Sequence, residues 1–162
     1  MHAIHIELPP LPVIGHPPTH YHKLSRRAEK AGDSHSYHAA KVGQYISAAL
    51  APGLPWEMQR RYFRHAIHGH CNPPPVAVTE VYQFYDHLQD MVQRFAGEEA
   101  IRAASRVDDR LEDRFRAGQS RESLRQVADE HFRSMFGDPT EKPDYLSEDD
   151  WHQIEVLRKQ WV

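Results

Sequence analysis

Regularly spaced apolar residues over 76–95 constrain the fold of this chain more than any other feature. They recur at alternating intervals of three and four residues, at Val78, Val81, Tyr85, Leu88, Val92 and Phe95. This spacing places them on one face of an α-helix and is typical of a bundle core or a coiled-coil seam. Tyr82, Phe84 and Met91 add apolar surface beside that face. A helix that is apolar over more than one stripe is usually central, so we expect several neighbours around it.

Helical spacing continues through most of the remaining chain, and glycine or proline interrupts it at intervals. We expect further helices over about 20–31, 35–51, 56–69, 98–117 and 121–136, and a last helix that begins at Ser147. The sequence therefore predicts an all-α fold, a helical bundle of about six to seven helices built from hairpins. Solenoid-like stacking of the hairpins is the alternative.

Capping residues and small residues mark how these helices begin, end and pack. Caps are expected at Thr19, at Asp33 or Ser34, at Ser120, and at Ser147, where Asp150 completes a capping box. Breaks are expected at Gly32, Gly69, Gly97, Gly118 and Gly137. The short turn at Gly32–Asp33 predicts an antiparallel hairpin, and Ala39 and Gly43 provide a groove for close helix approach.

The two ends of the chain differ from its middle. Residues 1–18 combine prolines with aliphatic side chains, which predicts an extended arm packed on the helical body or on a partner subunit. A helical core domain is expected over 19–137. A linker and a C-terminal docking helix are expected over 138–162.

Composition excludes several classes of protein. A length of 162 residues with 40% hydrophobic residues indicates one folded domain, and a net charge of −3 gives no global attraction to nucleic acid. No apolar run is long enough for a membrane span, and the N-terminus lacks a signal-peptide pattern. The single cysteine fits a reducing compartment, so we expect a cytoplasmic protein. No glycine phosphate loop, nucleophile elbow or HExxH motif is present, which favours a non-enzymatic role.

The end of the predicted helix 56–69 gathers four side chains that bind transition metals. His65, His68, His70 and Cys71 fall within seven residues, and His38 is expected to approach His65 or His68 if the first hairpin folds back. Imidazole and thiolate are ligands of zinc, copper and nickel, although the spacing matches no common zinc motif. The alternative is that the histidines cap the helix end and Cys71 is a small buried apolar residue. The cofactor, if any, is not identified by the sequence.

The predicted helix 98–117 carries four arginines at intervals of four residues, namely Arg102, Arg106, Arg110 and Arg114. Such a row could contact an acidic partner or a nucleic-acid backbone. Acidic residues are interleaved at Glu98, Asp108, Asp109, Glu112 and Asp113. The alternative is therefore a salt-bridged, solvated helix face with no ligand.

The last helix presents Trp151, Ile154 and Trp161 on one side. These residues need a surface to pack on, which is either the body of the protein or a partner. We expect a non-enzymatic interaction or assembly protein, as a homo-oligomer or with another protein. Metal binding through the histidine cluster is the first alternative, and nucleic-acid backbone binding through the arginine row is the second.

Overall fold

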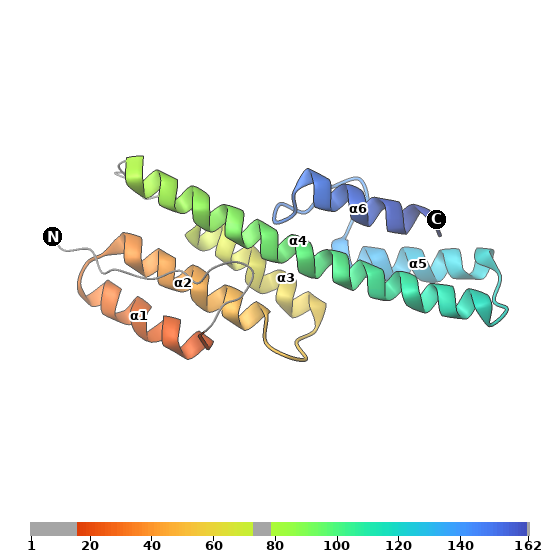
Figure 1. Ribbon diagram of the computed structural model, residues 1–162, viewed down its shortest axis with the longest axis horizontal. Helices are drawn as coiled ribbons and strands as arrows, with labels where there is room; N and C mark the ends of the chain where they lie inside the picture. The colour runs from red at the N-terminus through yellow and green to blue at the C-terminus, as the bar shows by residue number, and fades with distance from the viewer. Residues whose placement is uncertain (1–15, 73–78, 162) are drawn as a thin grey trace. The chain divides into compact units, whose positions relative to one another are not determined.

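The computed structural model describes residues 16–72 and 79–161, which form six α-helices and one π-helical turn (Figure 1). No strand occurs within those ranges, so the predicted all-α fold and helical bundle are confirmed. The predicted N-terminal arm lies outside the described residues, apart from its last three. No helix of the described residues is both long and apolar enough to cross a bilayer.

The chain divides into two compact units, residues 1–95 and 96–162. The first unit contains α1 (Pro18–Lys30), α2 (Ser34–Ala49), α3 (Trp56–His65), the π-helical turn η1 (Ala66–His70) and the beginning of α4 (Thr79–Arg116). The second unit contains the rest of α4 with α5 (Arg121–Phe136) and α6 (Glu148–Lys159).

In the first unit, α1 and α2 form the predicted hairpin. Gly32 makes the turn with a φ of +69°, a backbone conformation that residues with a Cβ rarely adopt. Tyr21 of α1 is 1% exposed and lies flat against Gly43 of α2. A Cβ built on Gly43 would lie 2.6 Å from the Tyr21 ring, so the predicted close approach at this glycine is confirmed.

Helix α3 continues into η1 instead of ending at Gly69. The helical path therefore ends at His70, one residue beyond the predicted end at Gly69, because the chain adds a π turn; the proline run 73–75 that was also expected to end the helix lies outside the described residues. Such turns close i→i+5 hydrogen bonds in place of i→i+4 and are frequent at functional sites. Helix α3 is fixed to α2 by Gln59, whose Nε2 donates to the carbonyl oxygen of Ala49 at 3.0 Å.

Three of the predicted caps are confirmed. Asp33 accepts from the backbone N–H of Ser36, Ser120 from that of Ser123, and Ser147 from that of Asp150. The prediction of a Thr19 cap is wrong, because α1 already begins at Pro18, whose ring pre-sets the first helical φ and makes a capped start unnecessary.

Helix α4 is a single helix of 38 residues, where two helices separated by Gly97 were predicted. A glycine inside a helix costs only about 1 kcal/mol relative to alanine, so Gly97 does not break this helix. Its missing Cβ makes room for the side chain of Asp150 in the α6 N-terminal turn. A Cβ at Gly97 would lie 2.0 Å from Asp150 Oδ2. The glycine therefore serves close packing between α4 and α6.

The second unit has its own core, and that core depends on both α5 and α6. Leu124, Ala128 and Phe132 of α5 are buried, as is Ile154 of α6. Gly137 ends α5 with a φ of 77°, as predicted. The linker that follows contributes the buried residues Tyr145 and Leu146 to the same core.

Candidate functional site

Two imidazoles meet in the first unit, one from α2 and one from η1. The Nδ1 atoms of His38 and His70 lie 2.9 Å apart, at hydrogen-bonding distance. One ring must donate and the other accept, because two N–H groups or two lone pairs cannot share this contact. The structure thus brings His38 to His70, whereas the sequence suggested His65 or His68 as its neighbours.

Two tyrosine rings of α2 contact this histidine pair. Tyr45 of α2 stacks on His70 with ring centroids 5.5 Å apart and on His65 at the same distance. Tyr37 lies edge-on to both His38 and His70, at 5.2 and 6.2 Å. Tyr37, His38 and Tyr45 all belong to α2, so the helix fixes their positions relative to one another. Packing against these tyrosines therefore limits how the two imidazoles can rotate.

Burial keeps both imidazoles of the pair uncharged at neutral pH. The pKa of His70 is lowered to about 4, first by burial and then by the nearby charges of His38, Lys41 and His65. The pKa of His38 is also lowered by burial. An uncharged imidazole with a free lone pair is the form that binds metal ions.

The other members of the predicted metal cluster lie in different surroundings. His65 and His68 are exposed, and Cys71 is 3% exposed. Burial raises the pKa of the Cys71 thiol to about 12, so the reactive thiolate does not form at neutral pH. Within the described residues no group of three or more His, Cys, Asp or Glu side chains is placed to hold a metal ion.

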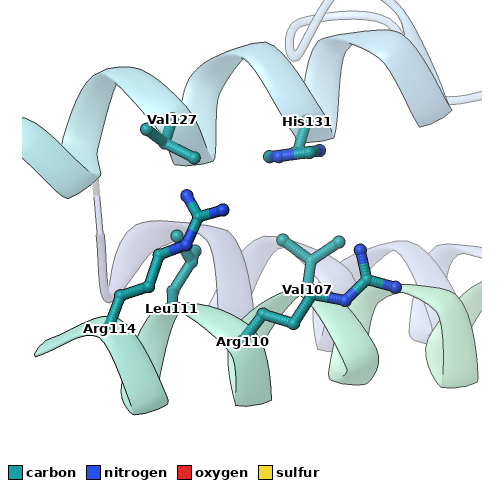
Figure 2. A pocket seen from close by; sticks show the side chains of 6 residues that line it. All are labelled: Val107, Arg110, Leu111, Arg114, Val127 and His131. Atoms are coloured by element: carbon teal, nitrogen blue, oxygen red, sulfur yellow. The ribbon is translucent and has the colours of Figure 1, made fainter. Parts of the chain in front are cut away.

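A small pocket in the second unit is lined by the last two arginines of the predicted row. Arg110 and Arg114 extend from α4 toward α5, and His131 of α5 faces them (Figure 2). The apolar floor of the pocket consists of Val107, Leu111 and Val127. The pocket has a volume of about 60 Å³, and none of its six lining residues is acidic.

The four arginines of the row differ in their partners. Arg102 forms an ion pair with Glu99, one turn earlier on α4. Over the described part of the chain, Arg106, Arg110 and Arg114 make no ion pair with any acidic side chain. The interleaved acids therefore form no close ion pair with the two guanidinium groups of the pocket within the described residues.

The C-terminal aromatic residues pack on their own unit. Trp161 is 5% exposed, and its indole N–H donates to Asp108 Oδ1 of α4 at 2.7 Å. Ile154 is 1% exposed. Trp151 is half-buried and lies edge-on to Phe136 of α5. The structure gives all three side chains the intramolecular packing surface that the sequence left open as an alternative to a partner.

Sequence reasoning missed His131 and Tyr45 as members of these two sites. His131 follows Val127 by one helical turn, so a helical projection of α5 places both on the face that lines the pocket. Tyr45 lies two turns after His38 on the same face of α2. Helical spacing in the sequence places each of these residues on the correct helix face. It identifies them as site residues only when the helix that faces them is known.

Comparison with protein-family models, with curated proteins and with solved structures finds no match to this chain.

Proposed function

We propose that this protein is a non-enzymatic helical binding protein that recognises an acidic segment of a partner protein through Arg110 and Arg114. The observation that carries this proposal is the pair of guanidinium groups at one pocket with no acidic lining residue. Arginine presents a planar fork of donors that matches a carboxylate or a phosphate group.

The spacing of the two arginines places two like charges side by side on α4. Arg110 and Arg114 are one turn apart on α4, and like charges at this separation destabilise a helix by roughly 0.2–0.5 kcal/mol. An anion bound between them would relieve this repulsion and would accept hydrogen bonds from both. The site therefore has an energetic reason to bind an anionic group.

The shape of the pocket suits the end of a side chain better than a large ligand. Its volume of about 60 Å³ is well below the roughly 300–1,000 Å³ of a small-molecule pocket. A carboxylate or phosphate group would fill this space, and its aliphatic stem would lie against Val107, Leu111 and Val127. A peptide side chain that carries such a group has this form.

The charges around the row favour a protein partner over a nucleic acid. A nucleic-acid backbone would run along Arg102, Arg106, Arg110 and Arg114 together, and it would also meet the acids between them. The whole chain has a net charge of −3, which gives no long-range attraction to a polyanion. A short acidic segment of a protein would contact only Arg110 and Arg114 at the pocket and would not meet the acids along the rest of the row.

The test compares four single variants of equal charge change on one helix. Binding of fluorescein-labelled peptides that contain glutamate or phosphoserine would be measured by fluorescence anisotropy at low salt. Arg110→Gln and Arg114→Gln should each weaken binding by about three- to tenfold, since each removes a charge-assisted hydrogen bond. Arg106→Gln and Arg102→Gln are the matched controls and should bind within about twofold of the unchanged protein.

Two outcomes would contradict the proposal. Equal weakening in all four variants would mean that the row acts as a continuous charged track and not as a pocket. Tight, strongly salt-dependent binding of a single-stranded oligonucleotide with no binding of either peptide would favour a nucleic-acid partner instead.

A further inference from the structure

We infer that His38 and His70 form a binding site for a divalent transition-metal ion of the zinc, copper or nickel class, in the first unit and independent of the arginine pocket. Two ring nitrogens from different helices face each other at 2.9 Å. In this arrangement a metal ion would replace the single proton that lies between the two nitrogens.

The geometry needs only a small adjustment to accept an ion. Zinc binds imidazole nitrogen at 2.0–2.1 Å, so two such bonds at a tetrahedral angle separate the nitrogens by roughly 3.3–3.4 Å. The present separation of 2.9 Å would have to widen by about 0.4–0.5 Å, which small rotations of the two rings can supply. This adjustment is confined to the two side chains, so neither α2 nor η1 has to move as a whole.

The surroundings of the pair are preorganised. Tyr45 stacks on His70, and Tyr37 lies edge-on to both imidazoles. The ring centroid of Tyr85, in the first-unit part of α4, lies 6.4 Å from that of His38. These contacts limit rotation of the two rings, and a fixed ring orientation favours metal binding. His70 owes its position to η1, and π turns are frequent at functional sites.

Buried polar atoms with unfilled hydrogen-bonding capacity lie in the same unit as the pair, and the ring centroid of Tyr85 is 6.4 Å from that of His38. Among the described residues, Tyr85 Oη and His35 Nε2 are buried and make no hydrogen bond. The rings of His35 and Tyr85 lie 6.0 Å apart. Buried polar atoms without a hydrogen-bond partner are rare. Water molecules that enter with a hydrated ion are one source of such partners.

The protein would supply two ligands, and water would complete the coordination. No third His, Cys, Asp or Glu side chain among the described residues is placed to join the site. One nearby charge works against cation binding, because Lys41 lies close enough to lower the pKa of His70. Removal of this charge should therefore strengthen metal binding.

The test uses the full-length untagged protein after treatment with a chelator. Zinc chloride would be titrated by calorimetry and followed in the side-chain ¹H–¹⁵N spectrum of the histidines. The His38 and His70 ring signals should shift first, before one equivalent is reached. His38→Gln and His70→Gln should weaken the tightest zinc-binding event at least tenfold, whereas Lys41→Gln should strengthen it severalfold.

The exposed histidines His87 and His152 supply matched controls, because His87→Gln and His152→Gln change the same side chain away from the pair. Both controls should bind zinc as the unchanged protein does. The proposal is overturned if the His38 and His70 signals do not move at one equivalent of zinc, a measurement on the unchanged protein that does not depend on the folding of any variant. It is also overturned if folded His38→Gln and His70→Gln proteins bind zinc with unchanged affinity.

Discussion

At the scale of single residues, Gly43 allows a closer contact between helices than any larger residue would. Gly43 of α2 lies against the ring of Tyr21, which is 1% exposed. Interiors are packed nearly as densely as organic crystals, so one added methyl group at such a contact cannot be absorbed. The glycine is therefore required by its neighbour and not by its backbone conformation.

Gly43→Ala should destabilise the protein although alanine is the better helix former. The added methyl would lie 2.6 Å from Tyr21 Cδ1, and overpacking of this kind costs about 1–3 kcal/mol. Urea denaturation would measure the change in the free energy of unfolding. Gly69→Ala is the control, because a Cβ there meets no atom within 4 Å. Equal stability of the two variants would show that the Tyr21 ring gives way.

At the scale of elements, α4 and α6 meet through a glycine and a carboxylate. Asp150 lies in the first turn of α6, where a negative charge suits the helix dipole. Its side chain also lies against Gly97, where a Cβ would approach Asp150 Cγ to 2.6 Å. One residue therefore both favours the start of α6 and packs against α4.

A double-mutant cycle would test this contact. Gly97→Ala alone should cost about 1 kcal/mol of unfolding free energy, the low end of the overpacking range, because the methyl displaces the end of the Asp150 side chain. In an Asp150→Ala background the same change should cost less than about 0.5 kcal/mol, since the obstructing group is gone and alanine favours the helix. Chemical denaturation of the four proteins gives the coupling energy, and a value near zero would contradict the contact.

The elements also show how far sequence reasoning can reach. Helix positions, the caps at Asp33, Ser120 and Ser147, and the end at Gly137 were predictable because they depend on neighbouring residues. The continuity of α4 was not, because Gly97 reads as a break until Asp150 is seen beside it. A glycine that permits close approach and a glycine that ends a helix look the same in a sequence.

The candidate sites divide in the same way. The sequence identified His38 and His70 as metal candidates and Arg110 and Arg114 as anion candidates, since residue type and helical spacing suffice for that. It did not distinguish the paired Arg102 from the two pocket arginines, because the difference depends on rotamers and on helix α5. The spacing of residues along one helix does not predict which side chains of a distant segment they contact.

At the scale of the whole molecule, each of the two units has a buried core of its own. Ile46 of α2 is 0% exposed in the first unit, and Leu124 of α5 is 0% exposed in the second. Native proteins open in cooperative segments that often coincide with such units. We expect the stability of each unit to respond mainly to its own core.

Native-state hydrogen exchange would test this expectation. Leu124→Ala should remove about 2–5 kcal/mol, and it should accelerate amide exchange in residues 121–161 far more than in residues 18–72. Ile46→Ala should give the reverse pattern and serves as the reciprocal control. Equal acceleration over both ranges in both variants would mean that the chain unfolds as one cooperative body.

The π turn at η1 carries a consequence for how this chain tolerates changes in length. A π turn takes up about one residue more than an α turn over nearly the same rotation, so one residue lost from within η1 would convert the turn to α-helix and leave the residues after it nearly in phase. His65 precedes the turn and His70 ends it, so both would keep their contacts with Tyr45. A residue added to α3 would find no such compensation, because each residue of an α-helix advances by about 100°. The phase that brings His70 to His38 should therefore tolerate a loss within η1 and not a gain in the helix before it.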